Sequence, residues 1–303
     1  MIVAENLTKS FGAKRAVQDV NFTVQPGKVT GFLGPNGAGK STTMRMIVGL
    51  DRPTSGTVSV NGRDYSRLRS PLTEVGVLLD AKAVHTGRTA RNHLRAMAAT
   101  HGIPRPRVQE VIDITGLSSV ADKRAGGFSL GMGQRLGIAA ALLGDPHTLI
   151  LDEPVNGLDP EGVMWVRRFV RYAASEGKTV LLSSHLMSEM ALSADHIIVL
   201  GRGRVLADAP VDDLVRQWTR AIVRVRSPRA ADVANLVTRD GVTVTHLTAD
   251  VLEIEGATGA EIGDAAAARG IPLHELTPTS GTLEDAYLRL TGDDVEYKTK
   301  DLS

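Results

Sequence analysis

Residues 34–41, which read GPNGAGKS, constrain the fold of this chain more than any other segment. A glycine, four further residues and then Gly-Lys-Ser form the spacing of a phosphate-binding loop. Small residues let the backbone wrap around a phosphate with its N–H groups pointing inward. The preceding run 28–34 predicts a buried strand, and the following run 41–50 predicts a helix whose N-terminus favours anions. The segment therefore predicts a strand–loop–helix unit that binds a nucleoside triphosphate.

The length, charge and composition of the chain exclude several classes of protein. The chain has 303 residues, which predicts two domains, and its net charge of +1 gives no electrostatic reason to expect nucleic acid as a partner. Cysteine is absent, which excludes disulfides, thiolate catalysis and cysteine-based zinc sites. No run approaches about 18 uninterrupted apolar residues, and the N-terminus does not resemble a signal peptide. We therefore expect any membrane role to come through a partner.

The distribution of apolar residues predicts an α/β core with a helical insertion. Strands joined by short turns are expected within the first 33 residues, and a hairpin is expected over 196–207. Further segments carry strand-like or helix-like patterns. The predicted strands are 55–62, 75–79, 148–151 and 179–184, and the predicted helices are 89–102, 105–117, 131–143 and 161–176. The three helices within residues 84–145 indicate an insertion between strands of the core.

The pattern changes beyond residue 220 and predicts a second domain. The predicted strands are 221–226, 241–247, 251–256 and 271–276, with helices at 230–239 and 258–270. The order βαββαβ is that of a split βαβ, ferredoxin-like unit. We therefore expect a first domain over 1–219, a small α+β domain over 220–292 and a flexible tail over 293–303.

Two carboxylates follow the predicted strand 148–151. A buried strand that ends in a carboxylate, here Asp152, is what a phosphate-binding-loop enzyme uses to hold Mg²⁺ and its water shell. Glu153 is the next residue, where a second carboxylate could polarise a water molecule for attack on the γ-phosphate. An acidic turn after a strand is common, so this pair alone would be a weak signal.

With these residues in place, the chain resembles the ATPase subunit of an ATP-binding cassette (ABC) transporter. The motifs occur in the family's order, and five ordered motifs are more specific than any one of them. They are GPNGAGKST (Walker A), FSLGMGQR at 128–135 (the signature), TLILDEP at 148–154 (Walker B), NGLDP at 156–160 (the D-loop) and SSH at 183–185 (the switch histidine). The resemblance implies a P-loop, RecA-like core with an antiparallel β subdomain and a helical insertion.

The resemblance also implies where ATP and Mg²⁺ bind. An aromatic side chain at Phe11 would stack on the adenine ring, and Val17 would flank the base. The loop would hold the phosphates through its backbone N–H groups and one lysine. The residues concerned are Asn36, Gly37, Ala38, Gly39, Lys40, Ser41 and Thr42. Ser41 and Asp152 would hold Mg²⁺.

Three residues are implied in hydrolysis. Glu153 would be the general base, and His185 would contact the γ-phosphate and steady the attacking water. Asp80 ends the strand 75–79 where the family usually has a glutamine that reaches Mg²⁺ and the water. Aspartate is one methylene shorter, so a bridging water could be needed at this position. An ordinary acidic strand end is the alternative for Asp80.

The signature residues are implied to act in trans. In this family Ser129 and Gly131 would close over the nucleotide of a second subunit, and Asp159 would help to couple the subunits. The expected assembly is a head-to-tail dimer, a homodimer in the simplest case, with ATP at both interfaces. The family signature usually reads LSGGQ, so Leu130 replaces a glycine and Met132 replaces a glutamine.

The leading functional hypothesis is an ATPase subunit that energises a membrane exporter from the cytoplasmic face. Its partner would be a polytopic permease, with residues 80–95, including His85, Arg88 and Arg91, as the candidate contact. The stretch 87–94 resembles the drug and antibiotic exporter branch. Substrate contacts would lie in the permease.

Two alternatives remain open. The first is an ABC-type ATPase that acts on ribosomes or DNA, although such proteins usually carry two cassettes or a long coiled-coil insertion. The second is an importer ATPase whose C-terminal domain binds a regulatory ligand. A simpler role for that domain is to stabilise the dimer or to pack on the cassette, because its sequence shows no clustered ligand chemistry.

Overall fold

The computed structural model describes residues 1–218, 222–279 and 281–291. It divides into two compact units, residues 1–211 and 212–290. The expected boundary between residues 219 and 220 and the expected flexible tail over 293–303 lie outside the described residues. Each unit is described by itself.

The first unit contains a small antiparallel sheet with the strand order β2-β1-β4. Its strands are β1 (Ile2–Phe11), β2 (Lys14–Val24) and β4 (Ser55–Val60). Ile2 lies opposite Val24 on one side and Val60 on the other, and all three are fully buried. The sheet therefore buries one apolar face, as the alternation in this part of the sequence predicts.

The larger sheet positions the functional residues. Its strand order is β5-β6-β7-β3-β8-β9, with the first five strands parallel and β9 antiparallel. The strands are β3 (Val29–Leu33), β5 (Val75–Leu78), β6 (Thr148–Leu151), β7 (Thr179–Ser183), β8 (His196–Gly201) and β9 (Arg204–Pro210). The β8–β9 pair confirms the expected hairpin. Strands β3, β6 and β7 are buried on both faces, so their apolar residues follow one another instead of alternating with exposed polar ones.

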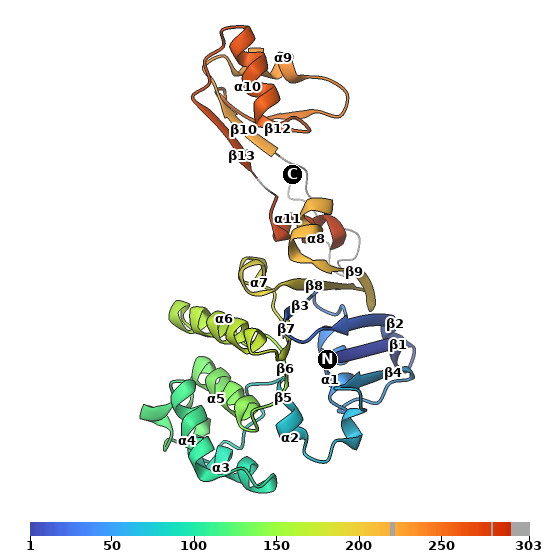
Figure 1. Ribbon diagram of the computed structural model, residues 1–303, viewed down its shortest axis with the longest axis vertical. Coiled ribbons are helices and arrows are strands. Elements are labelled where there is room, and N and C mark those ends of the chain that lie inside the picture. Colours follow the sequence, from blue (N-terminus) through green and yellow to red (C-terminus); the bar gives the residue numbers. More distant parts are fainter. Residues whose placement is uncertain (219–221, 280, 292–303) are drawn as a thin grey trace. The chain divides into compact units, whose positions relative to one another are not determined.

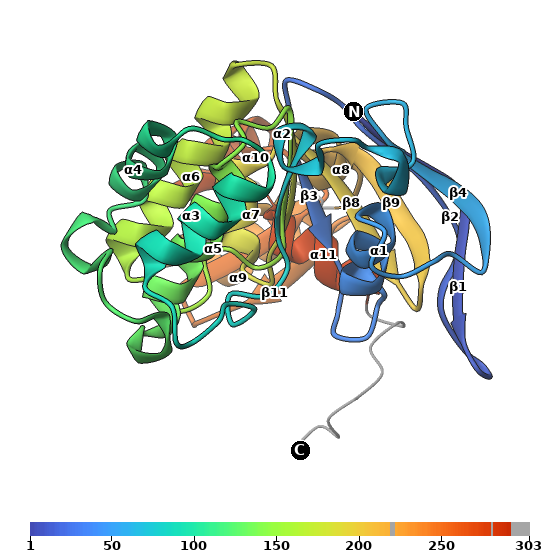
Figure 2. The same cartoon turned by 90° about the horizontal axis from the view of Figure 1, so that it is seen from below.

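Helices cover one face of this sheet, and α1 and the small antiparallel sheet lie on the other (Figures 1 and 2). The helices of the core are α1 (Lys40–Ile47), α2 (Pro71–Glu74), α6 (Pro160–Ser175) and α7 (Met187–Ser193). The helical insertion is confirmed, and its helices are α3 (Ala90–Thr100), α4 (Arg105–Ile114) and α5 (Leu130–Leu142). Short 3₁₀ turns occupy residues 65–67, 118–120 and 125–127.

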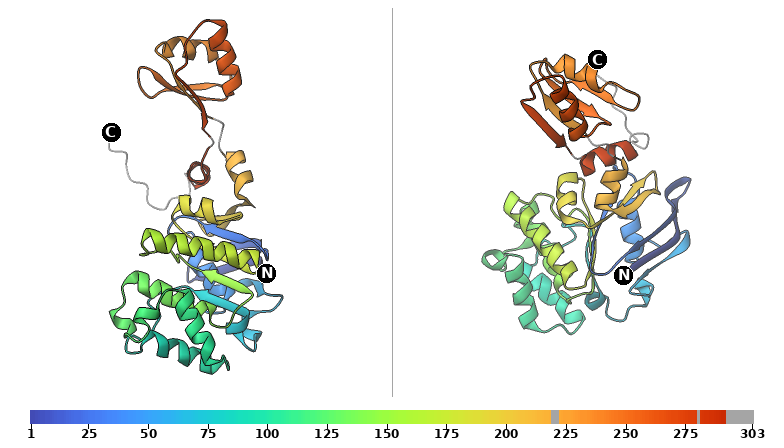
Figure 3. Two further views of the ribbon diagram at one scale, coloured as in Figure 1. Left: turned by 60° about the vertical axis from the view of Figure 1, so that its left-hand side comes forward. Right: turned by 45° about the horizontal axis from the view of Figure 1, so that its top comes forward.

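The second unit is the expected ferredoxin-like domain. Its elements are α8 (Val211–Trp218), β10 (Ile222–Arg226), α9 (Ala230–Val237), β11 (Thr243–His246), β12 (Val251–Glu255), α10 (Gly259–Ala268), β13 (Glu275–Thr279) and α11 (Leu283–Thr291). The sheet is antiparallel with the order β11-β12-β10-β13, and α9 and α10 cover one of its faces (Figure 3). Val223, Val225, Leu252 and Ile254 form the buried core beneath these helices.

One strand boundary in this unit was predicted wrongly. The fourth strand was expected at 271–276, but β13 spans Glu275–Thr279. Ile271 is only 6% exposed and packs in the apolar core, and Pro272 has no N–H to donate to a strand. Pairing with β10 therefore begins only where Glu275 lies opposite Arg226.

Helix α10 begins with a capping box that should make the stability of this unit depend on pH. Thr258 N–H donates to Glu261 Oε2 over 2.8 Å, and Arg239 donates to Glu261 Oε1 over 2.9 Å. Chiefly through the Thr258 N–H, these bonds lower the pKa of Glu261 from 4.5 to about 2. A carboxylate whose pKa is lower in the folded state than in the unfolded state stabilises the fold at pH values above its unfolded-state pKa. This stabilisation is lost as the pH falls through the folded-state pKa.

We therefore expect the domain to lose stability between about pH 5 and pH 2, and Glu261→Gln to reduce that loss. Urea unfolding followed by circular dichroism at both pH values would measure the difference. Equal losses in the wild-type chain and in the variant would contradict the prediction.

Candidate active site

The loop 34–39 joins the carboxyl end of β3 to the N-terminus of α1. Gly39 precedes the helix with φ +103°, a backbone conformation that side chains disfavour. A Cβ added there would also lie 2.6 Å from the carbonyl oxygen of Ala16. The glycine is needed because the loop turns sharply and passes close to β2.

Lys40 is the first residue of α1 and is folded back over the loop. Its Nζ donates to the carbonyl oxygens of Gly34 and Pro35. Burial lowers the pKa of Lys40, and the carboxylates of Glu153 and Asp152 act in the opposite direction. A partly buried cation therefore lies where the N–H groups of the loop and α1 also favour negative charge.

A cavity of about 400 Å³ opens over this loop. It is lined by Phe11, Lys14, Ala16, Asn36, Gly37, Ala38, Gly39, Lys40, Ser41, Thr42, Asp152 and Glu153. The loop residues expected to hold phosphate are thus brought together with both Walker B carboxylates. Phe11 is 51% exposed, with Lys9 Nζ 4.9 Å from the centroid of its ring, so an aromatic residue is accessible at the cavity wall.

Val17 is placed differently from the expectation. Its side chain is fully buried beneath Gly39 and does not line the cavity, which Ala16 and Lys14 line instead. The role of Val17 beside the base stays a prediction, and Ala16 and Lys14 are the β2 residues that reach the cavity. The sequence did not single out Ala16 or Lys14, because neither belongs to a motif.

A chain of hydrogen bonds joins the first turn of α1 to Asp152 and to the backbone of Glu153. Ser41 Oγ donates to Asp152 Oδ2 over 2.9 Å, and Ser183 Oγ donates to the other oxygen of Asp152. Glu153 N–H in turn donates to Ser183 Oγ over 2.9 Å. Ser183 thus fixes the side chain of one carboxylate and the backbone of the next. Its role was missed from sequence, although it begins the SSH motif.

Glu153 and His185 form a direct contact. His185 Nδ1 lies 2.8 Å from Glu153 Oε2, and this hydrogen bond requires the proton on Nδ1. The backbone of Glu153 has φ +50°, a strained conformation for a residue with a side chain, and such strain is common at functional sites. Gln134 of α5 donates to the Glu153 carbonyl oxygen over 3.1 Å. The ring and the N–H of His185 therefore bond the Glu153 carboxylate, while Ser183 and Gln134 hold the backbone of the same residue.

Asp80 lies just beyond the carboxyl end of β5, the strand beside β6. Its Oδ1 accepts a hydrogen bond from the N–H of Lys82 over 2.8 Å, and the residue is exposed. Asp80 is not among the residues that line the cavity. The strand order therefore brings Asp80 near the correct edge of the sheet, while its side chain is bonded within its own loop. Its metal role stays a prediction.

The residues expected to act in trans lie at the starts of two helices, outside the cavity lining. Ser129 caps α5 by accepting from the N–H of Met132 over 3.2 Å, and Gly131 lies in its first turn. Asp159 caps α6 by accepting from the N–H of Gly162 over 2.9 Å. Ser129 and Asp159 are exposed, so a second molecule can reach both.

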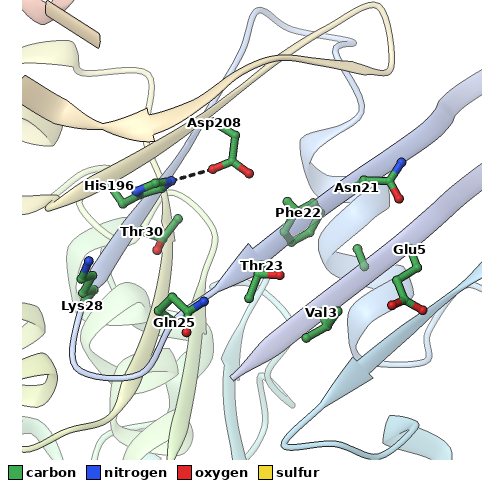
Figure 4. Close-up of a pocket in the computed structure, with 11 residues that line it drawn as sticks. Val3, Glu5, Asn21, Phe22, Thr23, Gln25, Lys28, Thr30, His196 and Asp208 are labelled. Carbon is green, nitrogen blue, oxygen red and sulfur yellow. Dashed lines mark hydrogen bonds and ion pairs between the residues drawn. The ribbon is translucent and has the colours of Figure 1, made fainter. Parts of the chain in front are cut away.

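A second cavity of about 500 Å³ lies at the opposite end of the same sheet (Figure 4). Its polar lining includes Lys28, Thr30 and a His196–Asp208 pair whose Nε2 and Oδ1 are 2.6 Å apart. Thr30 and His196 pair at the amino ends of β3 and β8. In open α/β sheets ligands bind beyond the carboxyl ends of the strands, so the loop cavity is the candidate active site.

Comparison with known proteins agrees with this choice. The family model "ABC transporter" matches residues 17–156. The bacitracin transport ATP-binding protein BcrA of Bacillus licheniformis is 34% identical over 298 residues, 96% of this chain and 97% of that protein. This chain belongs to the ABC transporter family. It is one of the family's ATPases: it binds and hydrolyses ATP to energise transport.

Other matches support the membership. The lantibiotic transport ATP-binding protein SrtF of Streptococcus pyogenes is 36% identical and covers 70% of this chain and 92% of that protein. A solved ATP-binding subunit of an ABC transporter has a TM-score of 0.66 at 28% identity, covering 72% of this chain and 92% of that chain. ABC ATPase homologues dimerise and work with membrane permease subunits.

Two further findings concern the rest of the chain. Residues 221–284, within the ferredoxin-like unit, match a domain model of unknown function. In the part of the chain that the structure describes, the helices are too short or too polar to cross a membrane.

Proposed function

We propose that this ABC ATPase energises an exporter of antibiotics or other lipophilic compounds. The observation that carries the proposal is the 34% identity to a bacitracin transport ATP-binding protein, which extends over 96% of the chain and includes the C-terminal unit. A Nod factor export ATP-binding protein of a Rhizobium species is also 34% identical over 95% of the chain. In this proposal a polytopic permease holds the ATPase at the cytoplasmic face of the membrane and carries the cargo contacts.

We infer that Mg²⁺ accompanies the nucleotide. Ser41 Oγ and Asp152 Oδ2 are 2.9 Å apart at the edge of the cavity, and both are oxygen donors of the kind that Mg²⁺ prefers. They would hold the ion, directly or through water, and the ion would neutralise phosphate charge. Ser183 would keep the Asp152 carboxylate oriented toward it. Glu153 would accept a proton from the attacking water, with His185 holding its side chain.

We further infer a head-to-tail homodimer. Ser129 and Asp159 are exposed and do not line the chain's own cavity, although their motifs belong to the hydrolytic machinery. A second copy could bring them to the nucleotide, because a serine hydroxyl and the N–H groups of a helix start suit a γ-phosphate. ATP would then draw the subunits together, and hydrolysis would release them.

Co-expression with a permease encoded by a neighbouring gene tests the exporter proposal. We expect the two proteins to co-purify and to move bacitracin or a similar lipophilic peptide across vesicle membranes when ATP is added. Glu153→Gln should abolish transport while co-purification persists. Purification with ribosomes or DNA and no membrane protein would favour the alternative function. Transport that responds to a small ligand only while residues beyond 220 are present would favour a regulatory C-terminal domain.

Asp80 gives a separate prediction about hydrolysis. If Asp80 reaches Mg²⁺ or the attacking water through a bridging water, Asp80→Ala should lower kcat by about tenfold or more with little change in KM for ATP. Asp113→Ala is a matched control, because this carboxylate bonds Gln109 and Ser118 on α4 and its neighbouring turn. ATP hydrolysis by the complete transporter is the measurement. Unchanged turnover in Asp80→Ala would show that Asp80 is only an acidic strand end.

A further inference from the structure

The signature departs from its family pattern at Leu130, and the structure shows what this leucine contacts. Leu130 begins α5 and packs over Gly157 in the D-loop, the loop that follows Walker B. A Cβ added to Gly157 would lie 2.5 Å from Leu130 Cδ2 and 2.6 Å from Leu130 Cγ. The leucine thus occupies the space directly above a residue that has no side chain.

The neighbouring contacts join the same two segments. A Cβ added to Gly131 would lie 2.7 Å from the carbonyl oxygen of Gly157, so the backbones approach closely there. Gln134, 5% exposed, donates to the carbonyl oxygen of Glu153 in Walker B, three residues before the D-loop. Arg135 Nη2 lies 4.0 Å from Asp159 Oδ1, where the D-loop ends. The first turns of α5 therefore contact the end of Walker B and the middle and end of the D-loop.

These contacts differ in what they can restrain. The Arg135–Asp159 pair is largely exposed on its carboxylate side and is weak. The Gly131 contact is a close approach with no side chain to hold it. Leu130 supplies apolar side-chain packing on the middle of the D-loop, where Gly157 has φ +71° and backbone hydrogen bonds of Asn156 and Leu158 hold the turn on either side. A glycine at position 130, as in the usual signature, could not make this contact.

We propose that Leu130 is a positioning residue that locks the D-loop to the signature helix, so that Ser129 and Asp159 meet the second subunit as one rigid block. The proposal rests on the inferred head-to-tail dimer. Leu130 itself is 48% exposed, so roughly half of its side chain is covered. Fixing both segments before association reduces the ordering cost that dimer formation would otherwise carry.

The expected result is weaker ATP-dependent dimerisation without loss of fold. In a Glu153→Gln background, Leu130→Ala should raise the dimer dissociation constant about tenfold, and Leu130→Met should stay within about twofold of the parent. Analytical ultracentrifugation of the full chain with ATP and Mg²⁺ measures this constant. The melting temperature of Leu130→Ala should stay within about 3 °C, because the side chain is only half covered.

A second pair of variants tests the contact with Gly157 itself. Gly157→Ala adds a methyl group against Leu130 and should also weaken dimerisation. Leu130→Ala/Gly157→Ala should dimerise better than Gly157→Ala alone, because the truncated side chain makes room. Gly177→Ala is the control for the general effect of alanine at positive φ, because Gly177 has φ +82° with no atom within 4 Å of an added Cβ and lies beyond the other end of α6. It should dimerise like the parent.

Hydrolysis gives an independent readout in the chain with Glu153 intact. Turnover by Leu130→Ala should fall at low protein concentration and recover at high concentration, because mass action restores the dimer. A defect that persists at high concentration would mean that Leu130 acts in the chemistry. If Leu130→Ala dimerised as tightly as the parent, or if the double variant dimerised no better than Gly157→Ala, the role of Leu130 would be overturned. The dimer proposal itself would stand. A parent that stays monomeric with ATP would overturn the dimer proposal and with it this role.

Discussion

Lys40→Ala is expected to weaken ATP binding by about a hundredfold or more and to abolish hydrolysis. Lys40 Nζ lies among the loop carbonyl oxygens of Gly34 and Pro35 and within the field of Asp152 and Glu153. When phosphates enter, the lysine can exchange two neutral acceptors for charged oxygens. Phosphate oxygens carry negative charge opposite to that of the ammonium, so these bonds gain direct charge attraction and the lost contact is large.

The fold should tolerate this substitution. Burial lowers the pKa of Lys40, which means that the folded chain bears a desolvation cost for this cation. Removing the cation relieves that cost but leaves two carbonyl oxygens without their lysine partner, so the two effects oppose each other. We expect a melting temperature within about 3 °C of the wild type.

Nucleotide titration by calorimetry is the measurement, and Lys28→Ala is the matched control. Lys28 precedes the other end of β3 and lines the second cavity (Figure 4). The Lys28→Ala variant should bind ATP as the wild type does. If Lys40→Ala bound ATP as tightly as the wild type, the loop would not be the site that binds the phosphates.

The layout of the site could be predicted from sequence because the motifs follow strand ends. Residues after β3, β5, β6 and β7 meet at one edge of a parallel sheet, whatever the details of packing. The spacing within GPNGAGKS also determines which residues form the loop and so line the cavity. The order of the motifs therefore located Lys40, Ser41, Asp152 and Glu153 correctly in one cavity.

Residues whose roles depend on packing could not be predicted this way. The β1–β2 pair has register shifts beyond Ala4, so alternation along the sequence does not decide whether Ala16 or Val17 faces the cavity. Ser183 is the last residue of a buried strand, and its contacts with Asp152 and with Glu153 N–H appear only once β6 and β7 are paired. The contact of Leu130 with Gly157 joins segments that no sequence period relates.

Glu153→Gln is expected to lower kcat for ATP hydrolysis by about a thousandfold while ATP still binds. Glutamine has nearly the shape of glutamate and can still accept the hydrogen bond from His185 Nδ1, which is 2.8 Å in the native site. The backbone N–H of residue 153 would keep its bond to Ser183. The variant therefore removes negative charge and proton affinity with little change in geometry.

A matched control and a second variant separate the role of Glu153 as the base from the role of His185, which holds the Glu153 side chain. Glu161→Gln changes an exposed carboxylate in the first turn of α6 and should leave turnover unchanged. His185→Ala removes the partner of Glu153 but leaves the base, so we expect a smaller loss, on the order of tenfold to a hundredfold. Single-turnover hydrolysis with saturating ATP measures chemistry apart from binding. If Glu153→Gln kept more than about a tenth of the wild-type rate, another group would have to accept the proton, and the His185-held carboxylate would lose its assignment as the base.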